Sequence, residues 1–353
     1  MPSFNFVKKT HINSSFKNQA IIDRYDISTK EVREQFIGNI DLDCDWNIGV
    51  IVGSSGTGKS SIIKELFDYK DEHIDHNKTP IELFDTDLST SEELLRNVGF
   101  SSPMSWIKPF GVLSNGEKMR VELAYKLSLN KDVVIFDEFT SVVDRQIAKI
   151  GSVAVSKTIK KYNKKFIAVT CHYDVLEWLQ PDWVFDTNNY EYKITRGLLR
   201  RPILEFKIHK IKGLWSLFSK YHYLDHKLNN AADQFAMVYN DIPVAFCAVL
   251  HFPHPKVRNM KKISRIVVNP EWQGIGLGTK FINFIGSYYA ENKYRVAITT
   301  SNPGLIKYFD TSNKWVIKSY GYLKKDSNTT LLKMTKRAGI KACTAEWSNK
   351  KCE

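Results

Sequence analysis

A short apolar segment, residues 47–53, leads directly into a glycine-rich segment that ends in Lys59 and Ser60. The stretch GSSGTGKS fits the pattern G-x-x-x-x-G-K-[S/T] between a predicted strand and a predicted helix. Glycines let backbone N–H groups turn inward around phosphate oxygens, and the start of the helix adds positive potential. We therefore expect a phosphate-binding loop made of Gly53, Ser54, Ser55, Gly56, Thr57, Gly58, Lys59, Ser60 and Ser61.

A second apolar run, VVIFDEF at residues 133–139, carries two carboxylates to the end of a predicted strand. In this arrangement Lys59 reaches the β- and γ-phosphates of ATP, and the Ser60 hydroxyl is a ligand of Mg²⁺. Asp137 is expected to hold the same Mg²⁺ through water, and Glu138 to polarise the attacking water. These residues predict a site that binds and hydrolyses ATP with Mg²⁺.

Residues 113–120, LSNGEKMR, lie between these two motifs and resemble the signature sequence, LSGGQ, of the ABC ATPase superfamily. Residues 141–144 are similar to the family's D-loop, and His172 to its switch histidine. The resemblance implies that Ser114 and Gly116 contact the γ-phosphate held by another protomer, and that His172 contacts it in its own. It therefore implies an ATP-dependent head-to-tail homodimer.

The chain departs from the family at several positions. Asn115 replaces the first glycine of the signature pair, and Glu117 replaces its glutamine. Residues 60–112 contain no glutamine, so the residue of the family's Q-loop is not identified; Asp85 or Asp87 could take its place. The interval is also short, so we expect a trimmed helical insert and no surface for coupling to a transporter.

Some aromatic and capping positions stay open at this stage. Residues 1–45 are polar with no strong periodicity, and Tyr25 or Phe36 could stack on adenine or belong to the core. A helix is expected near residues 90–98, with Thr90 or Ser91 as its N-cap.

A second glycine pattern lies in the C-terminal half. A predicted strand, residues 263–268, is followed by a turn and by QGIGLG, which opens an amphipathic helix. This pattern resembles the acetyl-CoA motif, Q/R-x-x-G-x-G/A, of the GCN5-related N-acetyltransferases (GNAT); a Rossmann-type turn is the alternative. The resemblance implies that Val267 and Val268 offer backbone groups to pantetheine. It implies that Gln273 opens the acetyl-CoA-binding motif and that the N–H groups of Gly274, Ile275, Gly276, Leu277 and Gly278 cradle the pyrophosphate.

The residues that would catalyse acyl transfer are less clearly marked. Tyr308 follows a predicted strand and resembles the family's general acid, although its spacing looks one residue short. His251 and His254 could act as base or bind phosphate, or could be surface histidines. The aromatic and basic stretch 220–226 could stack a base or simply pack. The general base and the acyl acceptor are left open.

Charge separates the two halves of the chain. Residues 203–353 hold 24 Lys and Arg against 10 Asp and Glu, a net of +14, within a chain whose net charge is +13. This excess favours a polyanionic partner such as nucleic acid; a generally lysine-rich surface is the alternative. We expect an ABC-type ATPase domain at 1–201, a GNAT-like domain at 202–336 and a basic C-terminal tail at 337–353.

The fold class expected is α/β: a P-loop ABC-type nucleotide-binding domain followed by a GNAT-fold α+β acetyltransferase domain. The leading hypothesis is an ATPase coupled to acetyl-CoA-dependent transfer to nucleic acid or a nucleic-acid-associated acceptor. The alternative is an ATPase whose GNAT-like domain is a non-catalytic sensor or clamp. The five cysteines form no CxxC pair, and no apolar run is long enough for a membrane span, so we expect a cytoplasmic protein without membrane contact.

Overall fold

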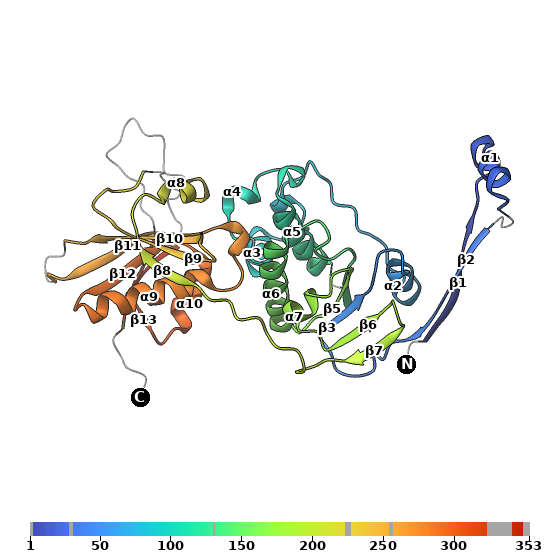
Figure 1. The fold of residues 1–353 in the computed structure, drawn as a ribbon. Helices are drawn as coiled ribbons and strands as arrows, with labels where there is room; N and C mark the ends of the chain where they lie inside the picture. The colour runs from blue at the N-terminus through green and yellow to red at the C-terminus, as the bar shows by residue number, and fades with distance from the viewer. Residues whose placement is uncertain are drawn as a thin grey trace. The chain divides into compact units, whose positions relative to one another are not determined.

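The computed structural model describes residues 3–27, 31–129, 131–222, 227–253, 257–322 and 341–348. The chain forms two compact units: Met1–Asp75 with Glu122–Pro202, and His76–Val121 with Ile203–Glu353. The change from one unit to the other at residues 121 and 122 falls within a single helix, α5 (Asn115–Ser128). Each unit is described by itself (Figure 1).

The first unit is built on a five-stranded sheet in the order β4-β5-β3-β6-β7, in which only the edge strand β7 is antiparallel. Every residue of the central strand β3 is buried, as expected for a parallel strand inside a sheet. The strands are β3 (Ile48–Val52), β4 (Val133–Phe136), β5 (Lys165–Thr170), β6 (Trp183–Asp186) and β7 (Glu191–Ile194). The helices wholly within this unit's core are α2 (Lys59–Phe67), α6 (Arg145–Tyr162) and α7 (Val175–Leu179).

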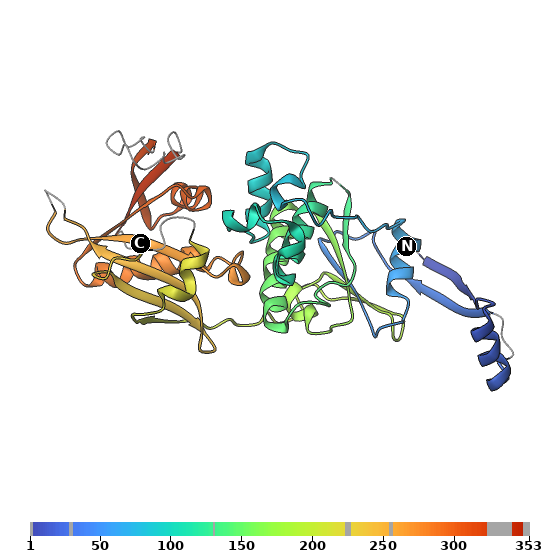
Figure 2. The same ribbon diagram turned by 90° about the horizontal axis from the view of Figure 1, so that it is seen from above.

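The N-terminal residues form an antiparallel hairpin, β1 (Ser3–His11) with β2 (Glu31–Asn39), joined through helix α1 (Phe16–Tyr25). Figures 1 and 2 both show this hairpin in dark blue, extending away from the five-stranded sheet with α1 at its far end. Only the base of the hairpin enters the core, where Phe4 and Phe36 are each 4% exposed. The sequence shows no strong period here because most of the hairpin has no buried face.

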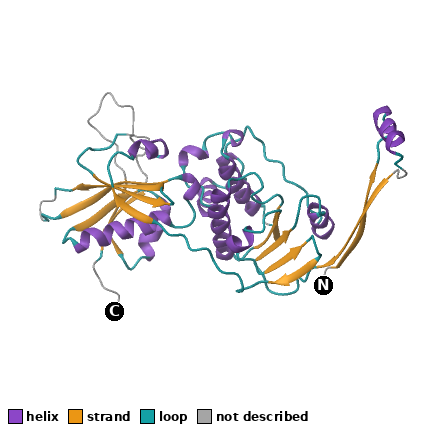
Figure 3. Ribbon diagram, viewed as in Figure 1, coloured by secondary structure: helices purple, strands orange, loops and turns teal. Residues whose placement is uncertain are grey.

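The second unit contains a seven-stranded sheet in the order β13-β14-β12-β11-β10-β9-β8, in which only the pair β11–β12 is parallel. Helices α9 (Leu277–Glu291) and α10 (Pro303–Thr311) lie on one face, and α8 (Trp215–Phe218) lies on the other (Figures 1 and 3). The strands are β8 (Lys207–Lys210), β9 (Asp233–Tyr239), β10 (Ile242–His251), β11 (Met260–Val268), β12 (Arg295–Thr300), β13 (Trp315–Tyr322) and β14 (Lys341–Trp347).

The same unit includes the short elements that precede the signature segment: η1 (Pro80–Glu82), α3 (Leu88–Asn97), α4 (Pro103–Trp106) and η2 (Phe110–Val112). Helix α3 begins earlier than expected. Its N-cap is Asp87, whose carboxylate accepts hydrogen bonds from the backbone N–H groups of Ser89 and Thr90. The expected cap at Thr90 or Ser91 is therefore wrong, because a carboxylate upstream already satisfies the first free N–H groups of the helix.

The basic C-terminal tail expected at 337–353 needs correction. Residues Lys341–Trp347 form β14, which lies inside the sheet and pairs with both β12 and β13. Cys343 and Ala345 are 1% and 0% exposed, so this strand belongs to the core of the second unit. The lysines near the chain end led to the prediction of a tail, because the apolar part of this strand is short and its partner strands are distant in sequence. The second unit therefore extends beyond the predicted limit at 336, and the limit at 201 stays a prediction.

None of the helices in the described part of the chain is both long enough and apolar enough to cross a bilayer.

Candidate functional site

The motifs of the first half converge because three neighbouring parallel strands end at one edge of a sheet. Strand β5 lies between β3 and β4, with Val52 in register with Thr170 and Phe136 with Ala168. The glycine-rich loop follows β3, Asp137 and Glu138 follow β4, and His172 follows β5. The carboxyl edge of an open α/β sheet is where such folds bind ligands.

The glycine-rich loop has the conformation that its glycines predict. Gly56 and Gly58 lie in the left-handed region, with φ of 84° and 83°, and Gly58 is the N-cap of α2. A side chain at Gly58 would place its Cβ 1.9 Å from the ring of Phe36. Phe36 therefore packs under the loop, and of its two proposed roles the structure shows packing in the core. Tyr25 is 67% exposed on α1.

Lys59 lies against the loop that it is expected to serve. Its ammonium donates hydrogen bonds to the carbonyls of Gly53, at 2.8 Å, and Ser54, at 2.6 Å. Burial lowers the pKa of Lys59, while Cys171 and Asp137 act in the opposite direction. A partly desolvated ammonium beside inward-turned N–H groups is suited to an anion with several oxygens.

Ser60 and Asp137 supply a hydroxyl and a carboxylate, and oxygen donors of this kind are those that Mg²⁺ prefers. Asp137 Oδ1 also accepts the N–H of Glu138, which orients the carboxylate at the end of β4. Glu138 has a φ of 52° and is exposed. The backbone N–H of His172 donates to Thr170 Oγ1 at 3.1 Å, which holds the turn after β5. The catalytic and metal-binding assignments of these residues stay predictions.

The signature residues belong to the other unit, where Ser114 and Gly116 begin α5. The Ser114 hydroxyl accepts the N–H of Glu117 at 3.3 Å, and Glu117 accepts the N–H of Ser114 at 3.1 Å. This reciprocal pair is a capping box. A capping box accepts either glutamate or glutamine at this position, so Glu117 is compatible with the start of the helix. Ser114 is exposed, so its hydroxyl is accessible at the start of the helix.

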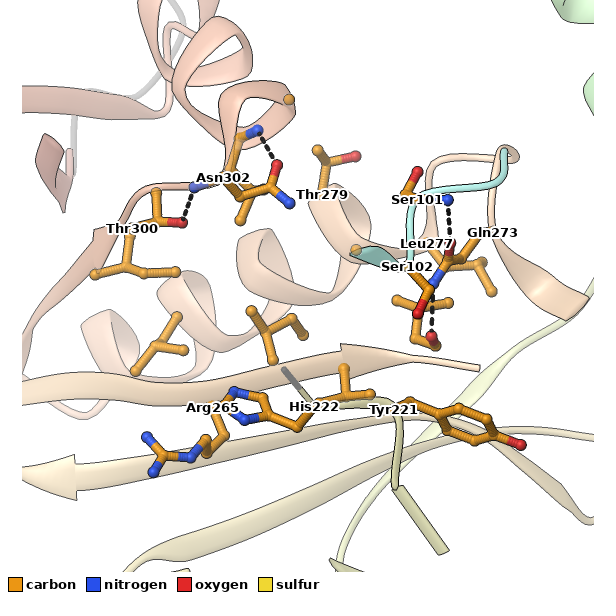
Figure 4. A pocket seen from close by; sticks show the side chains of 18 of the residues that line it. Ser101, Ser102, Tyr221, His222, Arg265, Gln273, Leu277, Thr279, Thr300 and Asn302 are labelled. Atoms are coloured by element: carbon orange, nitrogen blue, oxygen red, sulfur yellow. Dashed lines mark hydrogen bonds between the residues drawn. The ribbon is translucent and has the colours of Figure 1, made fainter. Parts of the chain in front are cut away.

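A cavity of about 400 Å³ lies in the second unit where the parallel strands β11 and β12 part. Their pairing runs only from Met260 with Arg295 to Ile263 with Ile298, although β11 continues to Val268 and β12 to Thr300. Beyond Ile263 the strands diverge, and the gap is bounded by the start of α9 (Figure 4). Of the predicted acetyl-CoA residues, those that line the cavity are Val267, Val268, Gln273, Gly274, Gly276, Leu277 and Gly278.

The turn before α9 exposes backbone toward this cavity. Gly274 and Gly276 have φ of 89° and 87°, and Gly276 is the N-cap of α9 without a capping side chain. The N–H groups of the first helical turn have no partner within a helix and face outward at its start. Ile275, which was also predicted, is half-buried and is not among the lining residues.

The side chain of Gln273 serves the protein itself. Its Oε1 accepts the N–H of Ser101 at 2.9 Å, and its Nε2 donates to the carbonyl of Val268 at 3.0 Å (Figure 4). These bonds tie the turn to the end of β11 and to a segment some 170 residues earlier. The backbone N–H of Gln273 donates to the carbonyl of Pro270 at 3.3 Å, so this residue lines the cavity mainly by holding the turn in place.

Several lining residues were missed by sequence reasoning. They include Ser101, Ser102 and Pro103 at the start of α4, Arg265 on β11, Thr300 at the end of β12 and Asn302 after it. Tyr221 and His222 also line the cavity and belong to the aromatic and basic stretch 220–226, whose residues 223–226 lie outside the described part of the chain. His222 is 7% exposed, with its ring centroid 5.6 Å from that of Trp215.

Tyr308 is not among the residues that line the cavity. Its hydroxyl lies 2.8 Å from Nδ2 and 2.9 Å from Oδ1 of Asn283, whose Oδ1 also accepts the indole N–H of Trp315 at 2.8 Å. This network ties α10 to α9 and β13, which favours a structural role over the general acid that the resemblance implied. His251 lies at the end of β10, outside the lining, and His254 lies outside the described residues.

Comparisons with known proteins find relatives of two kinds. The model of the acetyltransferase (GNAT) family matches residues 173–311. The energy-coupling factor transporter ATP-binding protein EcfA1 of Mycoplasmopsis pulmonis is 34% identical over 98 residues, or 26% of this chain. The match covers only 36% of that relative's length.

Two solved structures are similar in part. The ribosomal-protein-S18-alanine N-acetyltransferase of Escherichia coli is 12% identical, with a TM-score of 0.32, over 40% of this chain and 92% of its own. A dimeric ATP-binding cassette bound to ADP and Pi is 14% identical, with a TM-score of 0.40, over 55% of this chain and 98% of its own. The chain is therefore similar over 98 residues to a transporter ATP-binding protein, and its residues 173–311 match the model of the acetyltransferase (GNAT) family.

Proposed function

We propose that this protein binds and hydrolyses ATP in its first half and transfers an acetyl group from acetyl-CoA to an amine in its second. The observation that carries the second part is the cavity between the parted strands β11 and β12, closed at one end by the glycine turn of α9. It combines backbone N–H groups for a pyrophosphate with a mostly apolar strand edge for the pantetheine arm.

In the transfer, the acceptor nitrogen attacks the thioester carbonyl of acetyl-CoA. A C–N bond forms, the C–S bond breaks, and the proton that the amine loses is returned to the departing thiolate. Among the described lining residues, Tyr221, His222 and Arg265 carry titratable side chains. Of these three groups the imidazole is the one that most often acts as a general base in enzymes, so we propose His222 as the group that accepts the amine proton.

In the ATPase half, Gly53–Ser61 would bind the phosphates, with Lys59 on the β- and γ-phosphates. Ser60 and Asp137 would hold Mg²⁺, which neutralises phosphate charge when bound. Glu138 would orient the attacking water, and His172 would contact the γ-phosphate. Ser114 and Gly116 would complete the site of a second protomer, which makes an ATP-dependent head-to-tail dimer the proposed active state.

We propose nucleic acid, or a protein bound to it, as the acceptor. The net charge of +14 in residues 203–353 supports this choice, because lysines and arginines neutralise backbone phosphates. Nucleobase amines and lysine amines are both chemically competent acceptors. The cytoplasm is the proposed compartment because acetyl-CoA and ATP are both needed.

The test uses the full chain with acetyl-labelled acetyl-CoA, ATP and Mg²⁺, offered DNA, RNA and protein separately. Label transferred to one class identifies the acceptor, and mass spectrometry of its nucleosides or peptides locates the amide. His222→Gln should reduce transfer by about 100-fold or more. His251→Gln, outside the cavity, is the matched control. Acetyl-CoA binding without transfer to any class would overturn catalysis and support the alternative, a non-catalytic sensor or clamp.

A further inference from the structure

Two segments of the second unit that are far apart in sequence meet beside the cavity: residues 99–103 and the turn at 271–274. Gly99 has a φ of 83°, and a Cβ there would lie 2.5 Å from Nη1 of Arg120 and 2.8 Å from the carbonyl oxygen of Gln273. Only glycine permits so close an approach without displacing the turn. Ser101 adds its N–H to the Gln273 side chain at 2.9 Å.

Arg120 joins these two segments from the interior. It is 2% exposed, and its Nη1 donates to the carbonyls of Gly99, at 2.9 Å, and Gln273, at 2.8 Å. Its Nη2 donates to the carbonyl of Glu271 at 2.7 Å. All three acceptors are backbone carbonyls, so the planar guanidinium orients peptide groups on both sides of the contact.

The charge of Arg120 is retained at this buried position. Burial lowers its pKa to about 10, with Glu271 and Glu117 opposing that shift, and this value is still well above neutral pH. A buried guanidinium that bonds to the carbonyl side of a turn aligns the peptide dipoles, so that the opposite, N–H side of the turn becomes more positive. The peptide group that follows Gln273 carries the N–H of Gly274, a residue that lines the cavity just before α9 begins.

Arg120 also lies close in sequence to the signature residues. It is on α5, six residues after Ser114, the capping residue of this helix. Ser114, which caps α5, and Arg120, which bonds to the acetyl-CoA turn, thus belong to the same helical segment within the second unit.

We propose that Arg120 is a positioning residue for the acetyl-CoA turn, and that through it the signature segment and the acetyl-CoA cavity are thermodynamically linked. This inference rests on the proposed function, in which Ser114 and Gly116 contact ATP of a second protomer and the turn binds pyrophosphate. A shift of α5 on nucleotide contact would move the carbonyls of Gln273 and Glu271. By reciprocity, acetyl-CoA would change the affinity of the ATP-dependent dimer by the same factor.

The first test measures acetyl-CoA affinity by titration calorimetry on the full chain. Arg120→Met should weaken binding by about tenfold or more, because three charge-assisted hydrogen bonds are lost. Arg120→Lys keeps the charge but not the planar guanidinium, so its affinity for acetyl-CoA should lie between those of the wild type and Arg120→Met. Lys126→Met is the matched control, since it removes another buried cation of the same helix, one paired with Glu72 away from the cavity. It should leave acetyl-CoA affinity unchanged.

Thermal unfolding is used to check that each variant is folded. If Arg120→Met does not fold, the affinity of Arg120→Lys for acetyl-CoA tests the positioning role. Equal affinities in wild type and Arg120→Lys would then overturn the positioning role. Failure of the wild type to bind acetyl-CoA at all would overturn the proposed function itself, which keeps the two failures distinguishable.

The second test measures the linkage. The self-association of Glu138→Gln protein in ATP is measured by analytical ultracentrifugation over a range of protein concentrations, with and without acetyl-CoA. We expect acetyl-CoA to change the dimer dissociation constant by about fivefold or more, and Arg120→Met to abolish the change. An unchanged constant, in protein that binds both ligands, would overturn the linkage. A change that persists in Arg120→Met would exclude Arg120 as its route.

Discussion

The two glycine turns of this protein share their local geometry but differ in how each is supported. Gly58 and Gly276 are both N-caps in the left-handed region, with φ of 83° and 87°. At neither helix start does a side chain make a capping hydrogen bond. The first turn brings its own cation, since Lys59 is the next residue and bonds to the loop carbonyls. The second turn is held by Arg120, more than 150 residues earlier.

This difference shows that a glycine turn at a helix start is a general anion site whose neighbours decide its role. A cation inside the loop can reach the outermost phosphates of its ligand. A cation behind the loop can orient the peptide groups, which leaves the cavity side free for a long ligand.

The largest effect is expected from blocking chemistry at the first turn alone. Glu138→Gln should lower ATP hydrolysis by about 100-fold or more, because the group that polarises water is lost. ATP binding should persist, and the protein should accumulate as a dimer with ATP, as measured by phosphate release and ultracentrifugation. Glu65→Gln, an exposed position on α2, is the control. Monomeric behaviour of Glu138→Gln with saturating ATP would contradict the head-to-tail dimer.

The next effect tests whether the first turn depends on its own cation. Lys59→Ala should reduce ATP affinity by about 30- to 100-fold, the loss expected for charge-assisted contacts to phosphate. Acetyl-CoA affinity should stay the same. Lys64→Ala, exposed on the same helix, should change neither. Unaltered ATP binding by Lys59→Ala in a fluorescent-nucleotide assay would refute the assignment.

A smaller effect compares the glycines directly. Alanine in the left-handed region costs roughly 1–2 kcal/mol, so Gly276→Ala should lower acetyl-CoA affinity by about tenfold. Gly58→Ala should cost ATP affinity more, because its Cβ would also overlap the Phe36 ring. Both losses are measured by calorimetry. Adding Phe36→Leu should recover part of the Gly58→Ala loss; no recovery would mean that backbone strain alone accounts for it.

The smallest effect concerns pH. Burial lowers the pKa of Lys59, so the protonated form that binds phosphate is lost at a lower pH than for an exposed lysine. As pH rises into the alkaline range, ATP affinity should therefore decline by roughly a few-fold at a lower pH than an exposed lysine would give, as measured by nucleotide titration at a series of pH values. Lys59→Arg should remove the decline; an identical decline in that variant would point to another titrating group.

Local patterns were sufficient for much of this protein. The strand–glycine–helix succession at residues 47–67 and at 263–291 is confirmed as β3 with α2 and as β11 with α9. Such elements depend on neighbours a few residues away, since hydrophobic periodicity and glycine at positive φ are local properties. The fold class follows from the same patterns and is confirmed.

Other features depend on contacts between distant segments, which no local pattern contains. The N-terminal hairpin has only its base in the core, and β14 is recognisable only once β12 and β13 pair with it on either side. Tyr308 bonds to Asn283, and Phe36 lies under Gly58, so each has a partner that the sequence alone cannot supply.

The residues around each glycine turn were sufficient to predict the strand before it and the helix after it, because backbone conformation is set mainly by near neighbours. Only the tertiary structure decided that Gly99, Ser101 and Arg120 support the second turn. A buried guanidinium finds its carbonyl acceptors when separate segments pack together, and the energy of that contact depends on distance in space.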